Sequence, residues 1–153
     1  MTGLRAIACA AALGLAALFS SAALAEDVVS ADDITTVLES EGYAVQQIGP
    51  SMVGVVVGSQ VILVGVDSSE GDVTYVTYLP DLSLRELGYE FLNQFNTQIK
   101  FGRAYVDGDG DIAIQMDRNA TGGISTDNVL SDFDVFLMLV SKFLQDVATG
   151  TIA

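Results

Sequence analysis

Two apolar, β-branched runs separated by three turn-forming residues restrict this chain more than any other feature. The runs are Met52 to Val57 and Val61 to Val66, and Gly58-Ser59-Gln60 joins them. Such residues favour strands, and so short a connection makes neighbouring strands run antiparallel. The pair therefore predicts a hairpin. Because neither run alternates with polar residues, we expect the middle of the sheet to be covered on both faces.

Further strand and helix signals surround this hairpin. Four more segments have the composition of strands, namely Tyr43 to Ile48, Val73 to Leu79, Arg103 to Asp107 and Ile112 to Asp117. Three segments carry apolar residues at helical spacing: one opens at Ser30, one runs from Ser83 to about Lys100, and one runs from about Ser125 to Val147. The order is α-β-β-β-β-α-β-β-α. It predicts an α+β fold in which helices pack on an antiparallel sheet.

Residues 1–25 have the three zones of a cleavable signal peptide. Arg5 supplies the positive charge, residues 6–19 are apolar or small, and Ala23 and Ala25 suit a signal peptidase. The apolar run is shorter than the roughly 20 residues of a membrane-spanning helix, so an uncleaved anchor is the less favoured alternative. We therefore expect export, to the periplasm or the medium, of a single domain over residues 26–153.

The charge balance restricts the partners of the exported chain. Twenty acidic residues oppose six basic ones, for a formal net charge of −14, and Arg5 is one of those six. Binding to nucleic acid depends on neutralising phosphates with basic groups, so we expect no nucleic-acid partner. An anionic membrane surface is disfavoured for the same reason, and no membrane contact is expected after cleavage. The net negative charge is compatible with cationic ligands or partners.

The chemistry available after residue 25 is narrow, because that part of the chain contains no histidine and no cysteine. It cannot form a disulfide, and it lacks the usual ligands of zinc, haem and copper sites. Ser-His-Asp and Cys-His catalysis are excluded as well. We assign no catalytic residue and no cofactor. Glycoside hydrolysis by two carboxylates is the remaining enzymatic alternative.

The run Asp107-Gly108-Asp109-Gly110-Asp111 is the one candidate metal site. As an EF-hand loop it would place Asp107, Asp109 and Asp111 at positions 1, 3 and 5. Position 6, however, is Ile112 where glycine is needed, and position 12 is Arg118 where a bidentate glutamate is needed. The run therefore predicts a hairpin turn, with a weak calcium site as the alternative.

Other polar and aromatic residues have structural interpretations. We interpret Tyr75, Tyr78 and Tyr105 as strand residues with solvent-exposed hydroxyls. Asn93 and Asn96 lie on the polar side of the second helix, where solvation or a local hydrogen bond to the next hairpin is expected.

The last helix carries a candidate partner interface. Its main apolar stripe is expected to cover the sheet, whereas Val135, Met138 and Leu139 are expected to point away from it. Three apolar side chains among charged neighbours indicate contact with another subunit or a client. The alternative is that they are buried under the tail or the first helix.

The succession of residues from Leu92 to Leu130 resembles the YbjN family of bacterial proteins, to which a role in sensory transduction is ascribed. The similar segments are Leu92-Asn93-Gln94-Phe95-Asn96, Phe101 to Asp107, Ile112 to Asp117, Gly122-Gly123-Ile124-Ser125 and Asn128-Val129-Leu130. The resemblance implies a fold similar to type III secretion chaperones, with a twisted antiparallel sheet flanked by helices. It also implies a non-enzymatic binder, often dimeric, and it transfers no catalytic residue.

Together these observations predict a non-catalytic, exported protein-interaction module with a chaperone-like or regulatory role. Its partner would be another protein or a second copy in a homodimer. A calcium- or small-ligand-binding exported domain is the second alternative, and a carboxylate-based hydrolase is the third.

Overall fold

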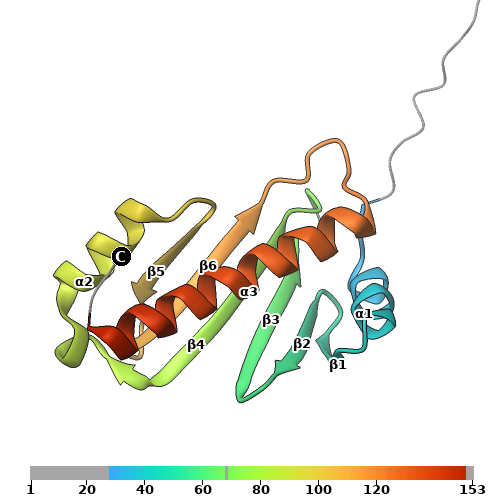
Figure 1. The fold of residues 1–153 in the computed structure, drawn as a ribbon. Helices are drawn as coiled ribbons and strands as arrows, with labels where there is room; N and C mark the ends of the chain where they lie inside the picture. The colour runs from blue at the N-terminus through green and yellow to red at the C-terminus, as the bar shows by residue number, and fades with distance from the viewer. Residues whose placement is uncertain (1–27, 68, 151–153) are drawn as a thin grey trace, which may run out of the picture.

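The computed structural model describes residues 28–67 and 69–150, and the predicted order of elements is confirmed (Figure 1). The signal peptide and its cleavage site lie outside the described residues. The helices are α1 (Ala31–Ser40), α2 (Leu84–Gln98) and α3 (Thr126–Thr149). The strands are β1 (Ala44–Gly49), β2 (Met52–Val57), β3 (Gln60–Val66), β4 (Val73–Ser83), β5 (Gly102–Val106) and β6 (Asp111–Arg118).

The six strands form one antiparallel sheet in the order β1-β2-β3-β4-β6-β5. The hairpin predicted from the two β-branched runs joins β2 to β3, with Val57 paired to Gln60. Strand β4 is longer than the predicted Val73 to Leu79. It continues past an irregularity to Ser83, which pairs with Asp111 of β6.

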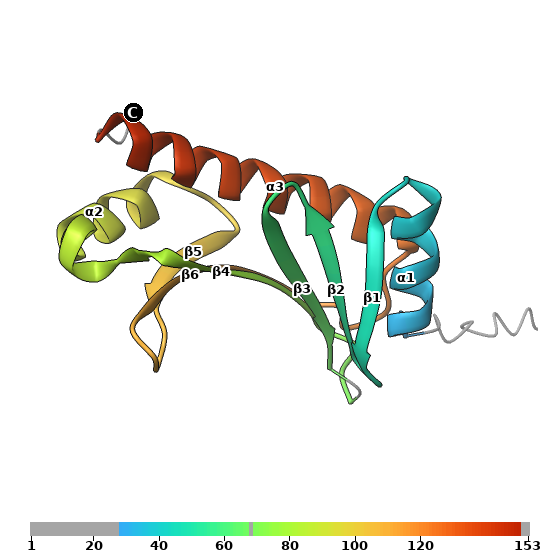
Figure 2. The same ribbon diagram turned by 90° about the horizontal axis from the view of Figure 1, so that it is seen from below.

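One face of the sheet forms the core with the helices. Figure 2 shows α3 running across this side, with α2 on the same side near β5 and α1 at the β1 end. Alternate strand residues point into this layer, because successive side chains of a strand point to opposite faces. The largest fully buried side chains are Tyr75, Phe95, Phe133, Phe136, Phe143, Ile34, Leu38, Ile62, Ile112, Ile114, Val53 and Val55.

The prediction that both faces of the sheet would be covered is wrong. Among the described residues, no helix lies against the opposite face (Figure 2), and apolar side chains of β2 and β3 that point there stay exposed. The physical reason is that all three helices place their buried residues in the same core cluster. An apolar run therefore does not imply a strand buried on both sides.

The helix starts agree with their capping boxes. The Ser30 amide donates to the Asp33 carboxylate at 3.0 Å, and the Ser83 amide donates to the Glu86 carboxylate at 3.2 Å. The second helix is not continuous, because Gly88 has a φ of 77° and breaks it after its first turn. None of the helices in the described ranges is both long and apolar enough to cross a membrane.

Candidate interaction surface

The uncovered side of the sheet carries most of the large apolar side chains that remain exposed. We define the open face by Ile48, Met52, Val56, Val61 and Tyr78, which are exposed by 56, 38, 51, 50 and 41%. These residues come from β1, β2, β3 and β4, so they extend across the strands instead of along one of them. A contiguous apolar surface of this kind is typical of a binding site.

Close packing around Gly54 joins the β1 and β3 parts of the open face. A β-carbon at Gly54 would lie 2.9 Å from Ile48 Cδ1 and 3.7 Å from Val61 Cγ1. The Ile48 side chain therefore lies over the strand at the point where β2 has no side chain of its own. This arrangement connects Ile48 to Val61 in one apolar surface.

Two tyrosines extend the open face towards β5. Ala113 of β6 pairs with Tyr78 on one side and with Tyr105 on the other, and it is fully buried. The Arg103 guanidinium lies 5.7 Å from the centre of the Tyr105 ring and 3.3 Å from Asp117. Arg103 and Asp117 thus form a neutral pair at the β5–β6 margin of the sheet.

A hollow of about 460 Å³ lies at one end of the strands, where the β3–β4 turn meets the open face. Met52 and Gly65 form its apolar part. Its acidic lining consists of Asp67, Asp72 and Asp117. The Asp67 Oδ1 accepts hydrogen bonds from the Ser69 amide and hydroxyl and from the Glu70 amide, and these lower the pKa of Asp67, the Ser69 hydroxyl having the largest effect. The hollow therefore presents a fixed negative charge beside an apolar side chain.

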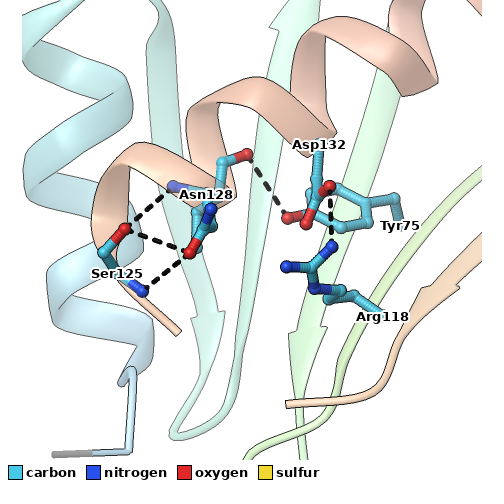
Figure 3. Close-up of polar contacts among 6 residues, drawn as sticks. Tyr75, Arg118, Ser125, Asn128 and Asp132 are labelled. Atoms are coloured by element: carbon cyan, nitrogen blue, oxygen red, sulfur yellow. Dashed lines mark hydrogen bonds and ion pairs between the residues drawn. The ribbon is translucent and has the colours of Figure 1, made fainter. Parts of the chain in front are cut away.

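A buried polar cluster lies on the covered side of the sheet, where β4 and β6 meet α3 (Figure 3). The prediction of an exposed hydroxyl is wrong for Tyr75, because the strand register places this residue beneath α3. The Tyr75 hydroxyl donates to the Val129 carbonyl at 3.4 Å. Burial raises the pKa of Tyr75, with a further increase from the charge of Asp132 and an opposing effect of Arg118.

Asp132 completes this cluster from α3. Its Oδ1 lies 3.6 Å from Arg118 Nη1, whereas its Oδ2 is buried and has no hydrogen-bond partner among the described residues. Burial raises the pKa of Asp132, and the charge of Arg118 partly offsets that effect. The cluster holds α3 on the sheet. The Oδ2 atom of Asp132 is closed to solvent.

The run from Asp107 to Asp111, predicted as a hairpin turn with a weak calcium site as the alternative, connects β5 to β6. The Asp107 Oδ1 accepts hydrogen bonds from the amides of Asp109 and Asp111, each at 2.9 Å. The carboxylate that would open a calcium loop is thus engaged by the turn itself. Within the described ranges, no group of three or more acidic, histidine or cysteine side chains is arranged to hold a metal ion.

The predicted interface residues on α3 do not form one exposed patch. Met138 is 63% exposed and Val135 is half-buried, but Leu139 is only 9% exposed and belongs to the core. The prediction that Leu139 points away from the sheet is wrong. Its Cδ1 would lie 2.7 Å from a β-carbon at Gly102, so Leu139 packs over β5 where glycine leaves space. Met138 alone remains a candidate contact there.

Asn96 makes the local hydrogen bonds predicted as one interpretation of the second helix. Its Nδ2 donates to the Ala104 carbonyl at 2.9 Å, and its Oδ1 accepts from the Ala104 amide at 2.8 Å. Asn93 is exposed and lines a shallow groove of about 500 Å³ between α2 and β5, together with Tyr89 and Val106. Asn96 is therefore structural, and the groove is open to solvent.

These features define an α+β protein whose antiparallel sheet is covered by helices on one face only. The family model described as "Putative bacterial sensory transduction regulator", named YbjN, matches residues 30–148. The chain belongs to the YbjN family.

Similarity to known proteins otherwise shows the fold alone. The chain is similar to the solved structure titled "Crystal structure of YbjN, a putative transcription regulator from E. coli", with 11% sequence identity and a TM-score of 0.63. The match covers 82% of this chain and 96% of that chain. No curated protein matches.

Proposed function

We propose that this protein is a non-catalytic regulatory module that acts by binding another protein through the open face. The observation that carries the proposal is the uncovered apolar surface formed by Ile48, Met52, Val56, Val61 and Tyr78. A surface of this kind costs free energy in water and is retained where it has a contact to make. The regulatory description of the family supports the same function.

The charge of the chain supports regulation through a protein contact instead of through nucleic acid. Twenty acidic residues oppose six basic ones, and three basic residues already pair with Asp117, Asp132 and Asp146. Few cations are left to neutralise phosphates. The signal-peptide pattern of residues 1–25 further supports action outside the cytoplasm, in the envelope or the medium, where a chaperone-like role towards a client is the second form of the proposal.

Site-specific photocrosslinking in the producing bacterium tests the binding surface. A photoreactive amino acid is placed at Val61 of the open face in one variant and at Met138 of α3 in another, since both side chains are at least half exposed. We expect protein adducts from position 61 and none from position 138. Adducts from position 138 alone would assign the contact to the last helix, and the absence of adducts at position 61 would contradict the proposed function.

A further inference from the structure

Among the residues that the structure describes, the open face carries no charge at its centre and many negative charges at its ends. Its defining residues are apolar or aromatic, and the nearest charged pair on that face, Arg103 with Asp117, is neutral as a unit. The two ends of the strands are different. They carry acidic turns that bound the apolar surface on opposite sides.

The first acidic rim consists of Asp67, Glu70 and Asp72 in the β3–β4 turn. The pairing of Val66 with Val73 places this turn at the end of the strands that also holds Met52. Asp67 and Asp72 line the hollow beside Met52. The Asp72 Oδ1 accepts a hydrogen bond from the Ala120 amide at 2.8 Å, so this carboxylate is held in place.

The second acidic rim lies at the opposite end of the strands. It consists of Asp81, Asp107, Asp109 and Asp111. The pairing of Ser83 with Asp111 and of Val106 with Ile112 places these residues beyond Tyr78 and Tyr105. A partner that covers the open face from one end to the other therefore meets carboxylates at both ends.

We propose, building on the function proposed above, that the occupant of the open face is a cationic protein segment. Its apolar side chains contact Met52, Val56 and Val61, and its lysine or arginine side chains meet the two acidic rims. Complementary charge of this kind guides the encounter and selects the partner, while the apolar contact supplies most of the affinity. The hollow beside Met52 fits the aliphatic stem and charged end of a basic side chain.

A second copy of this chain is the less favourable occupant. A symmetric dimer brings the same surface of both subunits together. Each copy would present two acidic rims on that face, and Arg103, a base on the same face, is already paired with Asp117. Like charges facing each other across an interface oppose association.

Binding of two model peptides to the full protein tests this inference. The first probe is an amphipathic peptide of leucine and lysine, and the second carries glutamate at every lysine position. Affinities are measured by fluorescence anisotropy at low and high salt. We expect the lysine peptide to bind, the glutamate peptide not to bind, and added salt to weaken the complex.

Two matched variants separate the effect of the first acidic rim on binding from the effect of the net charge of the protein. The rim variant is Asp67→Asn, Glu70→Gln and Asp72→Asn, which keeps the side-chain acceptors of the turn. The control is Glu39→Gln, Glu41→Gln and Asp134→Asn, three exposed acids from α1, the turn after it and α3 on the helical side. We expect the rim variant to lose at least about tenfold in affinity for the lysine peptide and the control less than about twofold, each converting to free energy at 1.4 kcal/mol per tenfold. Equal losses in both variants would overturn the inference, because net charge alone would then explain binding.

A third variant, Val56→Thr with Val61→Thr, separates failure of this inference from failure of the proposed function. Threonine keeps the β-branched shape and strand preference of valine but removes apolar surface. If both peptides bind equally and both lose affinity in this variant, the open face binds proteins but charge does not select them. If this variant changes the affinity for neither peptide, and the photoreactive residue at position 61 gives no crosslink, the proposed function itself fails. A dimer found by analytical ultracentrifugation and lost in this variant would assign the face to a second copy and overturn the cationic partner.

Discussion

At the scale of single residues, Asp132 is a carboxylate placed where its charge is unfavourable. Its side chain is 18% exposed, its Oδ2 has no hydrogen-bond partner among the described residues, and its contact with Arg118 is long at 3.6 Å. Burial, the largest effect, raises its pKa above the usual value. The folded protein therefore binds a proton at Asp132 more tightly than the unfolded chain does. This favours folding below the unfolded pKa of about 3.9 and is lost as the pH rises through the folded pKa.

We predict that Asp132→Asn stabilises the protein at pH 7, because asparagine removes the buried charge and keeps the shape. The expected rise in melting temperature is about 2–4 °C, corresponding to roughly 1 kcal/mol. It should shrink as the pH falls through the raised pKa of the wild-type carboxylate and be smallest below about pH 4, the range of the unfolded pKa. Thermal melts followed by circular dichroism at both pH values measure this, with Asp134→Asn on the exposed side of the same helix as control. A lower melting temperature at pH 7 would show that the Arg118 contact outweighs the cost of burial.

At the scale of elements, α3 shows how far periodicity predicts a helix and where it stops. The helix, its start at Ser125 and the stripe containing Phe133, Phe136 and Phe143 were predictable, because apolar spacing and capping residues are local properties. The inward position of Leu139 could not be predicted from the sequence. It depends on space over Gly102, a residue of a different strand, and no pattern within α3 reports that contact.

The two neighbours Leu139 and Met138 give a paired test of this packing. We predict that Leu139→Ala lowers the free energy of unfolding by about 2–4 kcal/mol, since it removes core side chain, whereas Met138→Ala changes it by less than about 0.5 kcal/mol. Urea denaturation of both variants measures the two effects. Similar values for the pair would contradict the assignment of Leu139 to the core and of Met138 to the surface.

At the scale of the whole molecule, the order of elements and the antiparallel sheet could be predicted, but the distribution of helices between the two faces could not. The β2 and β3 runs are apolar on both sides, and a strand between two covered faces has the same pattern as one with an uncovered binding face. The open face was therefore missed as a site. One signal in the sequence could have indicated an uncovered face. The chain has three amphipathic helices with one apolar stripe each, and these are too few to cover both faces of six strands.

Export also belongs to this scale, because the signal peptide predicted over residues 1–25 directs the protein out of the cytoplasm, where we propose that the open face meets its partner. We predict that the protein recovered from the cell envelope or the medium begins at Glu26, because Ala23 and Ala25 suit the peptidase. Intact mass spectrometry of the native protein measures this. Recovery of a species that retains Met1 to Ala25 would contradict cleavage.

The pairing of Asn96 with Ala104 has a consequence for growth of the sheet. An edge strand offers its backbone groups to any passing chain, which is how sheets recruit further strands and begin to aggregate. Here the side-chain amide of Asn96 in α2 provides the same donor and acceptor as the peptide group of a neighbouring strand. It hydrogen-bonds to both the backbone amide and the backbone carbonyl of Ala104. At the midpoint of β5 the Asn96 side chain thus blocks the pairing of a further strand with Ala104. An acidic protein can in this way expose an apolar face for a partner while a side chain protects the β5 edge of its sheet from polymerisation.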